Sequence, residues 1–248
     1  MVSEGFKKWA CSLSGCDGGN VNAKTWLCGI EWGGGSGDEG EYYESLKGQI
    51  RTGVHPGNDN LYNWEESLTY PFGRSFSKLY AAMKGEEVKN YKHFSKEVWS
   101  DSEVFKLNLY PIAFDSTDPQ LWHDNKMPEI TGFAEKYLYQ TWCAFNRFPA
   151  FARLRAVHNP DLIVCTGVSY LRDFLMCFGG NQSNLGFVNH GDLGAMTSDK
   201  TRPRRYYWVE LIGGTKLFVI PFFSGQYGLN SDALLQEMGE VIRDKVYA

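Results

Sequence analysis

Short apolar runs that stop at glycine or proline constrain the fold of this chain more than any other sequence feature. Residues 25–30, 104–110 and 161–167 are such runs, and each predicts a buried strand. Residues 206–212 and 216–222 predict two further strands, and the glycine pair between them indicates a hairpin. Because continuous apolar runs are typical of strands buried on both faces, the pattern favours an α/β domain.

Segments with helical spacing lie between these runs. Apolar side chains recur at that spacing within residues 75–83. Thr131 is suited to cap a helix that ends near residue 147, and Pro149 is suited to the first turn of the next helix. Two more helices are predicted at 169–177 and 232–245. The alternation predicts three α/β/α layers around a central, mainly parallel four-stranded sheet.

The domain organisation follows from length and from one irregular stretch. A chain of 248 residues suits a single domain, 1–248, and we find neither an internal repeat nor a clear linker. Residues 33–70 are rich in Gly, Asn and Tyr and lack periodicity. We interpret them as a long insertion at the mouth of the first strand, where loops carry function.

Charge and cysteine content narrow the classes of function. A formal net charge of −4 excludes a protein that is basic over its whole surface, but a local basic patch for nucleic acid is allowed. The six cysteines include no Cys-x-x-Cys pair, so we predict no metal and no cofactor, although Cys11 and Cys16 leave a metal open. We see no signal peptide or long apolar span, and we expect a cytoplasmic protein that needs no membrane.

Three strand ends resemble the uracil-DNA glycosylase superfamily. Residues 29–33 (Gly-Ile-Glu-Trp-Gly) stand where the family has Gly-x-Asp-Pro or a close relative. Residues 108–111 (Asn-Leu-Tyr-Pro) follow the second strand, and residues 221–225 (Pro-Phe-Phe-Ser-Gly) stand where the family has His-Pro-Ser or Asn-Pro-Ser. Residues 71–76 and 159–167 resemble the base-stacking segment and the third strand. The chain therefore resembles a divergent member of this superfamily.

The resemblance implies roles for individual side chains. A glycosylase flips its target base into a pocket, where a ring stacks on the base and an amide reads its edge. Phe72 would be the ring and Asn108 the reader, while Trp32 and Phe222 would line the pocket. Glu31 would orient water and stabilise the charge that develops on the sugar. The implied reaction is hydrolysis of the N-glycosidic bond of a flipped damaged or deaminated base.

The implied partner is DNA. The Ser224–Gly225 turn would meet a phosphate, and Gln226 and Tyr227 would probe the gap that the flipped base leaves. A local basic run would add phosphate contacts. That run comprises Lys200, Arg202, Arg204 and Arg205.

Each of these residues also has a simpler structural interpretation. Glu31 could pair with Arg74 or Lys78 at the strand end. Asn108 could hold a turn, and Phe72 could belong to the core. The basic run could be a solvated loop.

Phe222 separates two hypotheses about activity. It stands at the family's His or Asn position, and a phenyl ring cannot hydrogen-bond the leaving base. One hypothesis is therefore a glycosylase-like hydrolase, and the alternative is a catalytically impaired protein that binds nucleic acid or a nucleotide on the same scaffold. A third hypothesis, a small-molecule enzyme on a generic α/β scaffold, depends on fold analogy alone.

Overall fold

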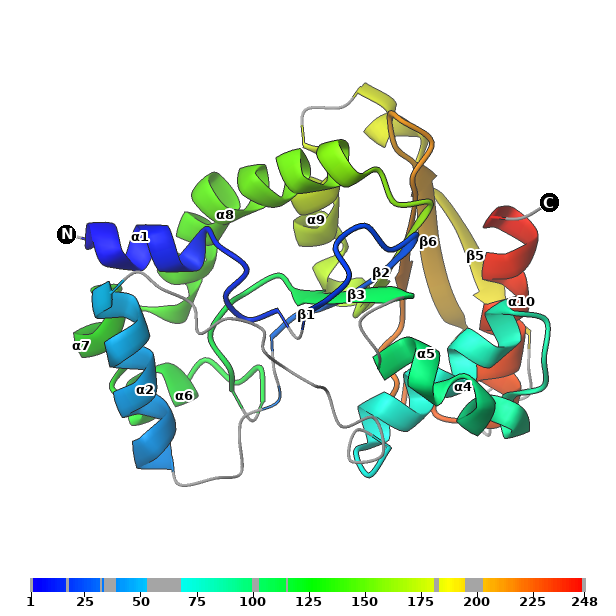
Figure 1. The fold of residues 1–248 in the computed structure, drawn as a ribbon, viewed down its shortest axis with the longest axis horizontal. Helices are drawn as coiled ribbons and strands as arrows, with labels where there is room; N and C mark the ends of the chain where they lie inside the picture. Colours follow the sequence, from blue (N-terminus) through cyan, green and yellow to red (C-terminus); the bar gives the residue numbers. More distant parts are fainter. Residues whose placement is uncertain are drawn as a thin grey trace.

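A computed structural model shows how the elements assemble (Figure 1). It describes residues 2–16, 18–31, 33, 39–52, 68–99, 103–114, 116–180, 183–194 and 203–246. Of the residues singled out above, Trp32, Lys200 and Arg202 lie outside the described residues.

Seven strands form one mixed sheet in the order β1-β3-β2-β4-β7-β6-β5. Their bounds are β1 (Gly18–Gly19), β2 (Thr25–Gly29), β3 (Val104–Asn108), β4 (Leu162–Thr166), β5 (Asn189–Leu193), β6 (Arg204–Glu210) and β7 (Lys216–Ile220). The neighbours β3, β2, β4 and β7 run parallel, whereas β1, β6 and β5 run antiparallel to the strands they pair with. The α/β class is confirmed. The sheet is larger than the four strands expected, because antiparallel strands extend both of its edges.

The parallel strands are buried on both faces, as their continuous apolar runs predict. Every residue of β2, β3 and β4 is buried. Successive side chains enter opposite cores, so Trp26 and Cys28 belong to one apolar cluster and Leu27 to the other.

Helices cover both faces of the sheet (Figure 1). The first core takes side chains from α1 (Glu4–Ala10), α2 (Glu39–Thr52), α8 (Lys136–His158) and α9 (Leu171–Phe174). The second takes them from α4 (Pro71–Met83), α5 (Ser95–Trp99) and α10 (Asp232–Val246). The remaining helical segments are η1 (Val88–His93), α6 (Leu121–Asp124), α7 (Met127–Thr131), η2 (Val168–Tyr170), η3 (Leu175–Gly179) and η4 (Ser183–Phe187).

The structure contradicts the prediction of one helix that begins after Thr131 and a second that begins near Pro149. Thr131 ends α7 instead of capping the next helix, and its Oγ1 donates a hydrogen bond to the Met127 carbonyl at 2.8 Å. One helix, α8, then runs without interruption through Pro149. A proline inside a helix removes a hydrogen bond. Here Phe148 and Phe151, on either side of it, are buried in the core and hold the helix against the sheet.

The interpretation of residues 33–70 as an aperiodic insertion is wrong for its first half. α2 forms there, and Leu46 and Ile50, one helical turn apart, bury themselves in the first core. The helix predicted at 169–177 is also more complex, because η2, α9 and the π-helical turn η3 follow one another. Among the described helices, none is both long enough and apolar enough to cross a membrane.

Candidate functional site

The strand order creates a switch point at the carboxyl ends of β2 and β4. After β2 the chain passes to β3 on one side, whereas β4 lies on the other side of β2. Such a reversal leaves a crevice at the strand ends, where α/β proteins bind ligands. Glu31 follows β2 and Gly167 follows β4, so both lie at this switch point.

Glu31 forms a buried ion pair there with Lys136, the first residue of α8. Lys136 Nζ lies 3.0 Å from Glu31 Oε1, and the two side chains are only 4% and 5% exposed. The ammonium also lies 4.1 Å from the centre of the Phe114 ring. Glu31 Oε2 is buried without a hydrogen-bond partner in the described structure. The carboxylate is therefore fixed on one side and incompletely satisfied on the other.

Burial changes the acidity of this carboxyl group. Loss of water raises the pKa of Glu31 to about 7, against the smaller lowering effect of the Lys136 charge and hydrogen bond. A carboxyl group with such a pKa exchanges its proton near neutral pH. That property suits a general base, because proton transfer works best when the pKa is close to the working pH.

Tyr170, which the sequence reasoning missed, lies within electrostatic reach of the same carboxylate. It belongs to η2, which directly follows Gly167 at the end of β4. Burial raises its pKa, and the negative charge of Glu31 raises it further. Its position four residues after a buried strand was a usable signal, because strand ends carry the ligand contacts in such sheets.

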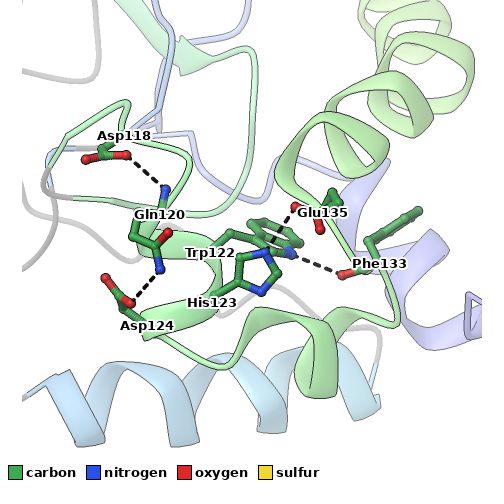
Figure 2. A network of polar contacts seen from close by, with 7 residues as sticks. All are labelled: Asp118, Gln120, Trp122, His123, Asp124, Phe133 and Glu135. Atoms are coloured by element: carbon green, nitrogen blue, oxygen red, sulfur yellow. Dashed lines mark hydrogen bonds and ion pairs between the residues drawn. The ribbon is translucent and has the colours of Figure 1, made fainter.

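Polar contacts join α6 to the residues directly ahead of Lys136 in α8 (Figure 2). The Trp122 indole donates to the Phe133 carbonyl at 3.0 Å. His123 Nε2 lies 3.0 Å from a carboxylate oxygen of Glu135, the residue directly before Lys136. These contacts tie α6 to the start of α8 and so hold the ammonium beside Glu31.

Asn108 is held in one orientation at the end of β3. Its Nδ2 donates to the Gly15 carbonyl at 2.8 Å, and its Oδ1 lies directly over Gly29 in the paired strand. Any side chain at position 29 would overlap that oxygen, so the glycine of the first motif makes room for the asparagine of the second. The amide therefore does more than hold a turn, since it ties the end of β3 to the segment after α1 and packs over the end of β2.

Two partly exposed rings lie at the same edge of the sheet. The Phe222 ring covers Gly167 so closely that a Cβ added to the glycine would lie 2.6 Å from the Cζ of Phe222. The backbone of Gly167 also has φ +119°, a conformation that favours glycine. Phe222 is 38% exposed and Phe72, at the start of α4, is 39% exposed. Phe72 therefore does not belong to the core, although its ring packs edge-on against Phe223 at 5.3 Å.

Arg204 and Arg205 have different surroundings despite being neighbours in β6. Arg204 is buried and donates to the carbonyls of Gln226 and Gly228, so it supports the loop that follows β7. Arg205 is exposed and forms a bidentate pair with Asp192 of β5 at 2.9 and 3.0 Å. The residues predicted to meet DNA on this loop are exposed. They are Ser224, Gly225, Gln226 and Tyr227.

The structure brings those predicted residues that it describes to one edge of the sheet, but their side chains have separate partners. Within the described residues, no hydrogen bond joins Glu31 to Asn108. The suggested pairing of Glu31 with Arg74 or Lys78 is wrong. Arg74 donates to backbone carbonyls of residues 68 and 69, and Lys78 pairs with Asp232.

All six cysteines are free thiols, and burial raises the pKa of Cys28 and of Cys165, which face each other across β2 and β4. A thiol must lose its proton to bind a metal, so these surroundings oppose ligation. Nowhere in the described ranges do three His, Cys, Asp or Glu side chains gather in a way that could hold a metal ion.

Comparisons with known proteins assign no family to this geometry. No family model matches the chain, and no curated protein and no solved structure matches it.

Proposed function

We propose that this chain is a divergent uracil-DNA glycosylase-like hydrolase, which cleaves the N-glycosidic bond of a flipped damaged or deaminated base in DNA. The observation that carries the proposal is the Glu31 carboxylate at the switch point. Lys136 holds one of its oxygens, and the other is buried without a partner among the described residues. Buried polar atoms are almost always hydrogen-bonded, so this oxygen marks a place where a water molecule or a ligand group would complete the site.

In the proposed reaction, Glu31 takes a proton from a water molecule as the water oxygen bonds to the anomeric carbon of the sugar. The bond from that carbon to the base breaks, and the base leaves with the electron pair and then takes up a proton. Lys136 keeps the carboxylate in place, and its Phe114 neighbour limits its movement. The carboxylate also stabilises the positive charge that develops on the sugar ring.

Asn108 and the two exposed rings supply the recognition in this proposal. The fixed Asn108 amide would read the edge of the base, and its bond to Gly15 limits the orientations it can adopt. Phe72 and Phe222 present partly exposed faces on which a base can stack. The exposed loop after β7, supported by Arg204, would approach the phosphate backbone.

The test is excision of uracil, hypoxanthine and xanthine from single- and double-stranded DNA, with abasic sites measured by alkaline cleavage. We expect Glu31→Gln to reduce the rate by about a hundredfold or more, because the amide cannot take the proton. Glu129→Gln, at an exposed carboxylate of α7, is the matched control and should retain activity. Equal abasic product from the wild type and Glu31→Gln would refute the proposal.

One observation favours a second candidate, a nucleic-acid or nucleotide binder without hydrolytic activity. The group over Gly167 is the Phe222 ring, which offers a stacking surface but no hydrogen bond to a leaving base. Titration calorimetry with DNA, RNA, nucleotides and free bases tests it. Binding that weakens in Phe222→Ala, without any abasic product, would favour this candidate over the hydrolase. No binding to any of these ligands would refute the second candidate.

A further inference from the structure

A groove between α1 and α8 lies away from the candidate site. Its volume is about 470 Å³, and its lining comprises Glu4, Lys7, Lys8, Cys11, Phe145, Asn146, Pro149 and Arg153. Phe145 follows Lys136 by nine residues, which is about two and a half helical turns. The groove therefore lies on the side of α8 opposite to the Glu31–Lys136 pair.

Helical spacing explains why these residues face one another. Phe145, Pro149 and Arg153 recur every four residues and so share one face of α8. Lys7 and Lys8 lie one turn after Glu4 on α1, which packs against α8 (Figure 1). The two helices present a ring and three cations to the same groove.

The groove combines an exposed ring with unneutralised positive charge. Phe145 is 77% exposed, although phenylalanine side chains are usually buried. Within the described residues, Lys7, Lys8 and Arg153 form no ion pair with a carboxylate, and Glu4 is the only acid in the lining. This local excess of cations occurs in a chain with a formal net charge of −4.

The backbone of α8 adds an acceptor to the groove. Pro149 has no N–H, so the Phe145 carbonyl cannot receive the usual helical hydrogen bond from residue 149. A carbonyl in this position can accept a hydrogen bond from a ligand that stacks on the Phe145 ring. A base offers both a face for stacking and amino or imino groups for donation.

We propose that the α1–α8 groove binds single-stranded nucleic acid. A base stacks on Phe145, and Lys7, Lys8 and Arg153 contact the phosphates on either side. Aromatic rings interleaved with cations are how proteins hold single strands without sequence preference. Charge complementarity favours this occupant, because the strand carries one negative charge per nucleotide. This surface does not depend on the function proposed for Glu31.

Fluorescence anisotropy with the full chain tests the proposal, using labelled oligo-dT, oligo-U and an abasic phosphodiester strand of equal length. Oligo-dT contains no uracil, hypoxanthine or xanthine, so its binding is independent of base excision. We expect Phe145→Ala to weaken oligo-dT and oligo-U binding about tenfold and to leave the abasic strand unaffected. Phe187→Ala is the control, since Phe187 is 78% exposed on η4 and outside the groove.

The cations are tested by the salt dependence of binding. Replacing Lys7, Lys8 and Arg153 together by Gln should make the negative slope of log K against log salt shallower by about 2, because three phosphate contacts are lost. The matched control replaces Lys89, Lys92 and Lys96, three exposed lysines of η1 and α5. Circular dichroism verifies that each variant is folded.

Three outcomes would overturn the proposal. The first is equal affinity for the oligo-dT and abasic strands together with no effect of Phe145→Ala. The second is equal loss of binding in the groove variants and their controls. The third is binding of a poly-glutamate peptide through Phe145 and the three cations without binding of either oligonucleotide, which would identify an acidic peptide as the occupant.

Discussion

Arg147 and Lys136 are buried cations on the same helix, about three turns apart, and they differ in the partners that surround them. Arg147 makes five hydrogen bonds to backbone carbonyls, of residues 10, 12, 14, 108 and 109, and its guanidinium lies 4.2 Å from the centre of the Phe151 ring. Lys136 has one carboxylate partner, Glu31, whose second oxygen has no partner in the described structure.

The difference in partners indicates a structural role for Arg147 and makes the Lys136–Glu31 pair the functional candidate. The carbonyls around Arg147 belong to the last residue of α1 and the segment after it, and to the end of β3 and the residue after it, so one side chain joins two parts of the fold. The Glu31–Lys136 pair joins a strand end to a helix start as well, but it leaves an acceptor free at the switch point. Burial of a charge alone therefore does not distinguish the two sites. The unpartnered oxygen, together with its place at the switch point, is what makes the Glu31–Lys136 pair the candidate.

The largest expected effect is the loss of the Arg147 contacts. Arg147→Met should lower the free energy of unfolding by about 3–5 kcal/mol, because several buried carbonyls lose their donor at once. Urea denaturation measures the change. Arg153→Met, at an exposed arginine of the same helix, is the control and should change stability by less than about 0.5 kcal/mol. Similar losses of unfolding free energy in both variants would contradict the structural role given to Arg147.

Removal of the Lys136 cation from the ion pair should have the next largest effect on the free energy of unfolding. Lys136→Met leaves the Glu31 carboxylate buried without its cation, so we expect a loss of about 3 kcal/mol at pH 8. The loss should be smaller at pH 5, where Glu31 is protonated and needs no counter-charge. The double variant Glu31→Leu/Lys136→Met should recover most of the stability. A loss that stays constant between the two pH values would contradict the coupling.

The smallest of the three effects is the pH dependence that Glu31 gives to the unaltered protein. Its pKa is about 7 in the folded state against an ordinary value of 4.5, so the folded state binds more protons between these values. The contribution of this group to stability is therefore fully present below about pH 4.5 and is lost as pH rises through 7. Between pH 5 and pH 8 the loss from this group is about 2.5 kcal/mol.

Denaturation of the wild type and of Glu31→Gln across this pH range isolates the contribution of Glu31. The amide does not titrate, so the difference in stability between the two proteins should change with pH as described. The Glu129→Gln control should follow the wild type. A constant difference between the wild type and Glu31→Gln would mean that Glu31 keeps an ordinary pKa.

Local sequence patterns predicted most of the central sheet. The runs at 25–30, 104–110 and 161–167 form β2, β3 and β4, and the hairpin around Gly213 is confirmed. The errors fell where long-range packing decides the outcome. Thr131 closes one helix instead of opening the next, and α8 passes through Pro149 because buried rings on either side of it hold the helix in place.

The positions of Glu31 and Asn108 at strand ends were predictable, but the contacts of their side chains were not. The glycines and polar residues at the strand ends were sufficient to single out Glu31 and Asn108. The partner of Glu31 was not predictable from spacing, since Lys136 is 105 positions away in the chain. Tyr170 was missed for a similar reason, because only the turn after β4 brings it within electrostatic reach of the carboxylate.

The sequence by itself determined that buried strands alternate with helices and that a carboxylate follows the first parallel strand. Both are local properties, since they depend on the apolar runs and on the residues where those runs end. Only the tertiary structure decided which cation meets Glu31, that one carboxylate oxygen lacks a partner in the described structure, and that Phe145 stays exposed beside Lys7 and Arg153. The physical reason is that desolvation and charge pairing depend on segments that are distant in the chain and adjacent only in the fold.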